Sequence, residues 1–166
     1  MIKTCDNSKA FHVLIALQAQ QKGQRPPSPP RQMRDLSTSS ILTKEFENYL
    51  KTEVDEENEN QTCQILLAFV MQCDKVRQTE NKKELKKLLN SMGQDFFNNP
   101  DRSKRVVLKN PSLRDDLRIN MTLTSSVPAN LWKAESDAFG QLDAHYQSFL
   151  KKRYQDKQHS LKACLL

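Results

Sequence analysis

The side chains that most often carry catalysis are few in this chain and far apart in its sequence. The three histidines are His12, His145 and His159, and none has a nucleophile and a carboxylate at a spacing typical of a catalytic set. Acid–base and nucleophilic catalysis need such groups within hydrogen-bond reach of one another. The sequence also lacks a glycine-rich phosphate loop, a nucleophile elbow and an HExxH pair. We therefore predict a protein that is not an enzyme, with no catalytic residues and no cofactor.

The cysteines do not indicate a metal site. Cys5, Cys63, Cys73 and Cys164 form no CxxC pair and have no pair of histidines nearby, so we expect no bound metal. Cys63 and Cys73 lie in an apolar run, where thiols usually act as small core residues. Free thiols are typical of a reducing compartment, which favours the cytoplasm.

One acidic segment stands out, Val54–Asn60, which contains one aspartate, three glutamates and two asparagines. These carboxylates lie on one short stretch and do not face each other across a cleft. They could act as charges and caps at the start of the next helix, or as contacts for a partner. Both interpretations stay open at this point.

Hydrophobic spacing predicts an all-α fold, because apolar residues recur at intervals of three and four and only three glycines are present. The longest such pattern is Val127–Tyr154, with Pro128 in its first turn. The pattern places Glu135 outside the apolar stripe. The stripe itself consists of Leu131, Trp132, Ala138, Phe139, Leu142, Tyr146, Phe149 and Leu150.

Four further helices are predicted ahead of this one. One covers Glu45–Thr52 after a Thr43 cap, and another covers Gln61–Gln78 after the acidic turn. A third covers Asn81–Phe97. The last follows a Ser112 cap, with its apolar side formed by Leu113, Leu117 and Ile119.

The chain divides into three predicted parts. Residues 1–35 contain a short helix over Lys9–Gln21 and a flexible proline-rich linker, Gly23–Pro30. Residues 36–158 form the helical domain, and residues 159–166 form a flexible tail. The linker is a stiff spacer or, as an alternative, a PxxP ligand of an SH3-type domain at Pro26–Pro29. No segment is long enough to span a bilayer.

The net charge of +6 permits nucleic acid, an anionic membrane or an acidic protein as a partner. A solvated basic surface explains the same surplus. The lysines on the third predicted helix, and the basic residues after it, lack interleaved aromatic residues and a helix-turn-helix pattern. We therefore predict no binding to nucleic acid. The lysines in question are Lys82, Lys83, Lys86 and Lys87.

The order of several short motifs resembles the regulator of G-protein signalling (RGS) domain. Phe46–Leu50 is similar to the first helix of that family, and Glu56–Asn58 matches its E-E-N turn. The doublet Phe96–Phe97 closes a lysine-rich helix, Leu108–Arg114 is similar to an L-x-x-x-x-R region, and Tyr146–Lys151 matches a closing Y-x-x-F-L-K stretch.

The resemblance covers about residues 41–155 and implies an RGS-like bundle of about nine helices in two subdomains. Its implied partners are heterotrimeric G-protein α subunits. The family binds the switch regions of GTP-loaded Gα and promotes hydrolysis, and it donates no catalytic group because Gα holds its own arginine and glutamine. The implied location is the cytoplasm, with the nucleus and the membrane periphery near Gα as further places.

The resemblance also implies which residues contact Gα, although the sequence differs from the family pattern at several positions. The segment Glu59–Gln64 separates the E-E-N motif from the apolar helix, so Asn58 or Asn60 could make the contact. Lys109 replaces an aspartate of the family, and Ala144–Ser148 lacks its acid and its arginine. We therefore expect GTPase activation that is weak, selective or absent, with an RGS-like scaffold module as the alternative function. The implied contacts are Glu56, Glu57, Asn58, Asn60, Arg114, Asp115, His145 and Ser148.

Overall fold

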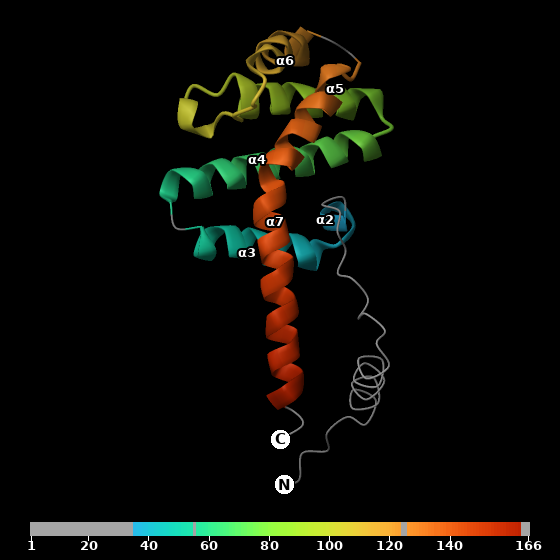
Figure 1. The fold of residues 1–166 in the computed structure, drawn as a ribbon. Coiled ribbons are helices and arrows are strands. Elements are labelled where there is room, and N and C mark those ends of the chain that lie inside the picture. The colour runs from blue at the N-terminus through green and yellow to red at the C-terminus, as the bar shows by residue number, and fades with distance from the viewer. Residues whose placement is uncertain (1–34, 55, 124–125, 164–166) are drawn as a thin grey trace. The chain divides into compact units, whose positions relative to one another are not determined.

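The computed structural model describes residues 35–54, 56–123 and 126–163, in which all regular structure is helical (Figure 1). The all-α prediction is confirmed for these residues. About nine helices and two subdomains are not confirmed there. The predicted helix Lys9–Gln21 and the proline-rich Gly23–Pro30 lie outside the described residues. The elements are α2 (Asp35–Thr38), α3 (Ser40–Glu53), α4 (Glu57–Gln78), α5 (Lys82–Met92), the π-helical η1 (Gly93–Phe97), the 3-10 turn η2 (Arg102–Lys104), α6 (Pro111–Leu123) and α7 (Asn130–Ala163).

The chain forms two compact units. Residues 32–149 make up one of them, which contains α2 to α6 and the first part of α7. Residues 1–31 and 150–166 make up the other, whose described part is the remainder of α7. This helix continues to Ala163, past Tyr154, where we expected the amphipathic pattern to end. None of the helices in the described ranges is long and apolar enough to cross a membrane.

Helix α3 begins earlier than predicted. Ser39 caps it, because its side-chain oxygen accepts a hydrogen bond from the N–H of Leu42 at 3.2 Å. Thr43, the predicted cap, lies inside the helix and donates its hydroxyl to a carbonyl oxygen of α2 at 2.6 Å. The earlier start places Leu42 on the same buried side as Phe46 and Leu50, so burial of one more apolar residue accompanies the longer helix.

Helix α4 also begins early and includes most of the acidic segment that we predicted as a turn. Glu57 and Glu59 lie in its first turn, where negative charge interacts favourably with the helix dipole. The predicted apolar side is buried, and it makes α4 a central helix of the unit. Its buried residues are Cys63, Leu66, Leu67, Phe69, Val70, Cys73 and Val76.

The structure has α5 followed by η1 where we predicted one continuous helix. In η1 the N–H of Asn98 bonds to the carbonyl oxygen of Gly93 at 2.9 Å, which is the i to i+5 pattern of a π-helix. The wider turn lets two consecutive aromatic rings enter the core. The ring centroids of Phe96 and Phe97 lie 5.5 Å and 5.7 Å from that of Phe69 on α4.

The predicted apolar side of α6 is confirmed at Leu117 and is half-buried at Leu113, and the prediction is wrong at Ile119. Leu117 and Met121 are buried, whereas Ile119 is 55% exposed. Ser112 is not its cap. Asn110, just before the helix, accepts hydrogen bonds through Oδ1 from both the N–H and the hydroxyl of Ser112, at 3.1 Å and 2.7 Å.

Within residues 32–149, α3, α4 and α5 pack as successive neighbours, with α6 beyond α5 and the first part of α7 crossing α3 and α4 (Figure 1). Aromatic contacts hold the crossing with α3. The ring centroids of Tyr146 and Phe149 on α7 lie 5.2 Å and 5.3 Å from that of Phe46. Edge-to-face and tilted pairs at these distances are favourable beyond the area that they bury.

At the start of α7, the burial of two residues is the reverse of what we predicted. Trp132 is 37% exposed, and Glu135 is only 4% exposed. The reason is Arg77 on α4, which forms an ion pair with Glu135 and also places its guanidinium carbon 4.7 Å from the Trp132 ring centroid. A carboxylate can be buried when a charged partner is held beside it. Of the remaining predicted stripe within residues 32–149, Phe139 is half-buried and the other members are buried, namely Leu131, Ala138, Leu142, Tyr146 and Phe149.

Candidate functional site

A row of three polar residues runs along α7, at Asp137, Gln141 and His145. Their spacing of four places them on one side of the helix, and we name them the α7 polar row. The first member binds the backbone ahead of α6. Its Oδ2 accepts hydrogen bonds from the N–H groups of Lys109 at 2.7 Å and Asn110 at 3.5 Å.

The other two members of the row bind different segments. Nε2 of Gln141 donates a hydrogen bond to the carbonyl oxygen of Val107 at 3.0 Å. Nε2 of His145 lies 3.1 Å from Oε1 of Glu59 in the first turn of α4. The α7 polar row therefore holds the segment before α6 and the start of α4 beside the same helix.

Asn60 closes the turn between α3 and α4, which we name the α3–α4 corner. Its Nδ2 donates to the carbonyl oxygen of Lys51 at 3.2 Å, and its Oδ1 accepts a hydrogen bond from Gln64. Asn58 is exposed, and its side chain makes no hydrogen bond within the described residues. Of the two asparagines that the sequence left as alternatives, Asn60 fixes the corner and Asn58 faces solvent.

The structure brings five of the eight predicted contact residues to this corner, namely Glu56, Glu57, Asn58, Asn60 and His145. The first four lie at the start of α4, and the pair between Glu59 and His145 joins α7 to them. Ser148 lies three positions after His145 on α7, where its hydroxyl donates to the carbonyl oxygen of Ala144. Arg114 and Asp115 lie in the first turns of α6 and contact each other at 3.4 Å. In the described part of the chain, no hydrogen bond or ion pair ties Ser148, Arg114 or Asp115 to the other five.

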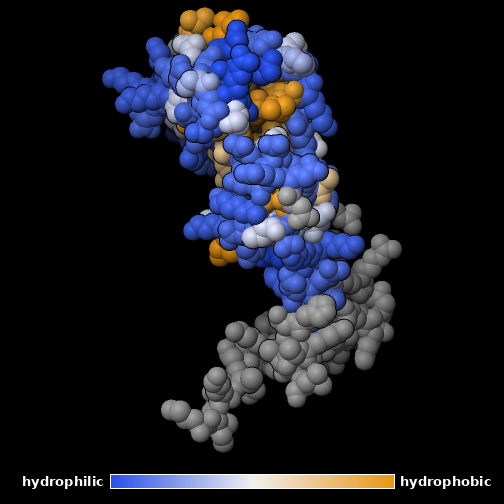
Figure 2. Space-filling view, turned by 90° about the vertical axis from the view of Figure 1, so that its left-hand side faces the viewer, coloured by the Kyte–Doolittle hydropathy of each residue, from blue (hydrophilic) through white to orange (hydrophobic). Residues whose placement is uncertain are grey.

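The side of the unit that carries this corner also carries the loop between η1 and α6 (Figure 1). Figure 2 looks onto that side, which is predominantly hydrophilic with small hydrophobic areas. The charge differs between the two segments. The start of α4 is acidic, whereas Arg102, Lys104 and Lys109 make the loop basic. Val107 is 55% exposed, and its backbone is held by the α7 polar row.

The thiol nearest the corner is not suited to chemistry. Burial, with a smaller effect of the Glu59 charge, raises the pKa of Cys63 to about 11. Burial raises the pKa of Cys73 as well. A thiol that keeps its proton at neutral pH is a poor nucleophile and a poor metal ligand. In the ranges that the structure describes, no three histidine, cysteine or acidic side chains are placed to hold a metal ion.

Reasoning from the sequence missed Asp137, Gln141 and Val107. Neither Asp137 nor Gln141 belonged to the predicted apolar stripe, and no motif marked them. The only available signal was the spacing of four between Asp137, Gln141 and His145, and spacing alone does not distinguish residues that bind a neighbouring segment from residues in solvent. The partners of Asp137 and Gln141 are 27 to 34 residues away in sequence.

Comparison with protein-family models, with curated proteins and with solved structures finds no match to this chain.

Proposed function

We propose that this protein binds the switch regions of GTP-loaded Gα subunits and promotes GTP hydrolysis weakly or selectively. The proposal begins from the order of motifs that resembles the RGS family. The observation that supports it is the α7 polar row. This row holds the start of α4 and the segment before α6 beside one helix. Two segments that are distant in sequence therefore border a common surface.

The proposed mechanism needs a rigid surface and no reactive group. Gα supplies its own arginine and its water-orienting glutamine, and a partner that fits the switches best in their transition-state arrangement lowers the barrier. Asn58 would contact the switch region through its exposed amide. Asn60 would act as a positioning residue, because its amide already binds Lys51 and Gln64. A corner that is ordered before binding loses less conformational entropy on association.

Weak or selective activation is expected from the residues around the corner. Lys109, where the family has an aspartate, is held through its N–H by Asp137, and its side chain is exposed. His145 pairs with Glu59 and is thereby directed towards α4. Loss of charged contacts at the centre of an interface reduces affinity. A side chain whose charge has the same sign as the facing group on a partner excludes that partner.

The deciding experiment is capture of purified Gα subunits by the full chain. Gα is loaded with GDP alone or with GDP and aluminium fluoride, which together mimic the transferring phosphoryl group. We expect preferential capture of the fluoride form of at least one Gα class. Asn58→Ala should reduce this capture, and Asn48→Ala, at an exposed asparagine of α3, is the matched control. Equal capture of both forms, or none, would contradict the proposal.

The alternative is an interaction module that does not distinguish the nucleotide state of Gα. An observation on α6 favours it. Ile119 and Leu123 are 55% and 76% exposed, and their spacing of four places them on one side of the helix. Exposed apolar residues in a row are typical of a protein contact. Under this alternative, Ile119→Lys would abolish partner binding, and Asn58→Ala would leave it unchanged.

A further inference from the structure

The loop between η1 and α6 presents a short, fully exposed tip. Residues 100–104 are all exposed, and they lie between the buried Phe97 and the buried Val106. The 3-10 turn η2 lies in this tip and contains only three residues. A turn of that length has few backbone hydrogen bonds to lose, so it opens at low free-energy cost.

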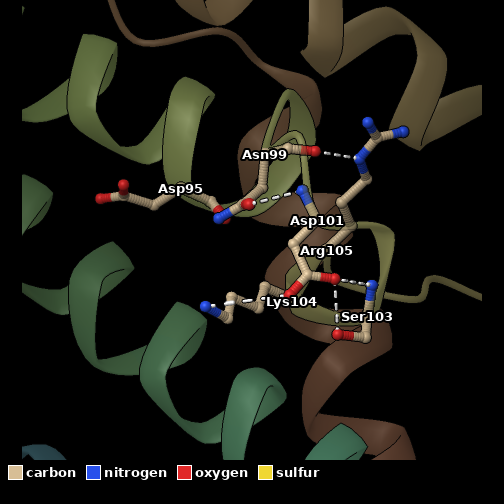
Figure 3. Close-up of polar contacts among 6 residues, drawn as sticks. All are labelled: Asp95, Asn99, Asp101, Ser103, Lys104 and Arg105. Atoms are coloured by element: carbon tan, nitrogen blue, oxygen red, sulfur yellow. Dashed lines mark hydrogen bonds and ion pairs between the residues drawn. The ribbon is translucent and has the colours of Figure 1, made fainter.

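Ser103 is held in this tip by Asp101 (Figure 3). The N–H and the hydroxyl of Ser103 both donate to Oδ1 of Asp101, at 3.0 Å and 2.7 Å. The backbone N–H of Asp101 donates in turn to Oδ1 of Asn99 at 3.0 Å. The serine hydroxyl is therefore exposed at the chain's surface and fixed by a carboxylate that also caps the turn.

Three cations flank this serine. Arg102 and Lys104 are its direct neighbours and are exposed, and Arg105 follows. Nζ of Lys104 lies 3.8 Å from Oδ2 of Asp101, and Nε of Arg105 donates to the carbonyl oxygen of Asn99 at 2.6 Å. Residues 101–105 thus carry three positive charges and one carboxylate, a surplus that suits an added anionic group.

We propose that Ser103 is a phosphorylation site for a protein kinase that selects serines with basic neighbours. The γ-phosphoryl group of magnesium ATP would transfer to Oγ of Ser103. The bond between the γ-phosphorus and the bridging oxygen of ADP breaks, the bond from phosphorus to Oγ forms, and the hydroxyl proton leaves through the base of the kinase. ADP is the second product.

Phosphorylation would release the cap on the turn. Phosphoserine has no hydroxyl proton to donate to Asp101, and its charge of about −1.5 to −2 repels the carboxylate. The cations that flank the serine can pair with the phosphate instead. The release of Asp101 would loosen η2, which immediately precedes the segment held by the α7 polar row.

Ser112 is a natural comparison within the same chain. Its N–H and hydroxyl both donate to Oδ1 of Asn110, in the same pattern and at similar distances. Ser112 also has a basic residue two positions later, Arg114. It lies, however, inside the 13-residue helix α6. A kinase binds its acceptor segment in an extended conformation, so the short turn around Ser103 should be the better substrate.

The test uses the folded full chain, magnesium ATP and the catalytic domain of a protein kinase C, with sites located by tandem mass spectrometry. We expect Ser103 to carry most of the incorporated phosphate. Ser103→Ala should remove most of it, and Ser112→Ala should not. A double variant, Arg102→Ala with Lys104→Ala, should slow the reaction about tenfold, because two charge contacts to the kinase are lost. Thermal unfolding of each variant confirms that it is folded.

Two results would overturn the proposal. One is a folded chain that stays unmodified at Ser103, or that carries its phosphate on Ser112 or another serine. The second concerns the turn itself. Amide exchange at Ser103 should become about tenfold faster after phosphorylation, because a hydrogen bond to a charged acceptor is lost. An unchanged exchange rate would contradict the release of Asp101.

Discussion

Two asparagines of the α3–α4 corner, two positions apart, have different environments. Asn60 donates to a backbone carbonyl of α3 and accepts from Gln64, so it links the two helices. Asn58 is exposed in the first turn of α4. Sequence alone could not assign them, because the assignment depends on where α4 begins. Its start at Glu57 turns the two side chains in different directions.

Substitution of each asparagine should separate binding from stability. Asn60→Ala should lower the free energy of unfolding by about 1 kcal/mol, since it removes two partly exposed hydrogen bonds. Asn58→Ala should leave that free energy unchanged and weaken capture of fluoride-activated Gα about tenfold. Urea denaturation and the capture assay measure the two quantities. A large loss of stability in Asn58→Ala would contradict the assignment.

Cys63 should be unreactive in the folded protein and should make stability depend on alkaline pH. Its folded pKa of about 11 is above the ordinary value of 9.0, so the folded state keeps the proton between these values and the unfolded state loses it. Stability is therefore unaffected below pH 9 and decreases as the pH rises towards 11. Urea denaturation at pH 8 and pH 10 measures this change, with Cys63→Ala as the control. An equal decrease in the Cys63→Ala variant would assign it to other groups.

At the scale of the elements, Gly93 and Gly140 have different surroundings. A Cβ atom added to Gly93 in η1 would lie 3.1 Å from Cβ of Met121 and 3.2 Å from Cγ2 of Thr122, both on α6. A Cβ atom added to Gly140 in α7 would meet no atom within 4 Å. The first glycine permits close packing of two elements, and the second has no such role.

Alanine at these positions should change stability in opposite directions. Gly140→Ala should stabilise the fold by about 0.5–1 kcal/mol, because alanine favours the helix. Gly93→Ala should destabilise it by about 1–3 kcal/mol, because η1 and α6 would have to move apart. Thermal unfolding of the two variants compares them under the same conditions. Equal stabilisation by both substitutions would show that η1 and α6 are not packed so closely.

Sequence patterns predicted most elements, and the reasons for the exceptions are specific. Apolar spacing located the helices and most buried residues of α4 and α7, because periodicity depends only on nearby positions. It misplaced Glu135, since the burial of that carboxylate depends on Arg77, 58 positions earlier. It misplaced the start of α3 because Ser39 and Thr43 are equally good caps by residue type. Asp137 and Gln141 of the α7 polar row were missed for the same reason as Glu135, because their partners are also distant in sequence.

For the molecule as a whole, the proposed function makes a prediction about rate. In a single-turnover assay with a Gα that the protein captures, we expect GTP hydrolysis to accelerate by about tenfold or less. The reason is that the residues around His145 lack the acid and the arginine found in the RGS domains that the motifs resemble, so charged contacts that would favour the transition state are absent. A GTP-loaded Gα alone is the control. Strong acceleration across several Gα classes would contradict this expectation.

The π-helical turn η1 determines where the segment from α5 to η1 can lose a residue. A π-helical turn holds about one residue more than an α-helical turn in the same rotation. Deletion of the exposed Gln94 would therefore allow an ordinary α-helical turn and keep the buried side of α5 in register with Phe96 and Phe97. Deletion of one residue inside α5 would instead rotate everything before it by about 100° relative to the aromatic pair, which is the angle that one residue occupies in an α-helix. The same change in length would thus be mild in η1 and would act as a core mutation in α5.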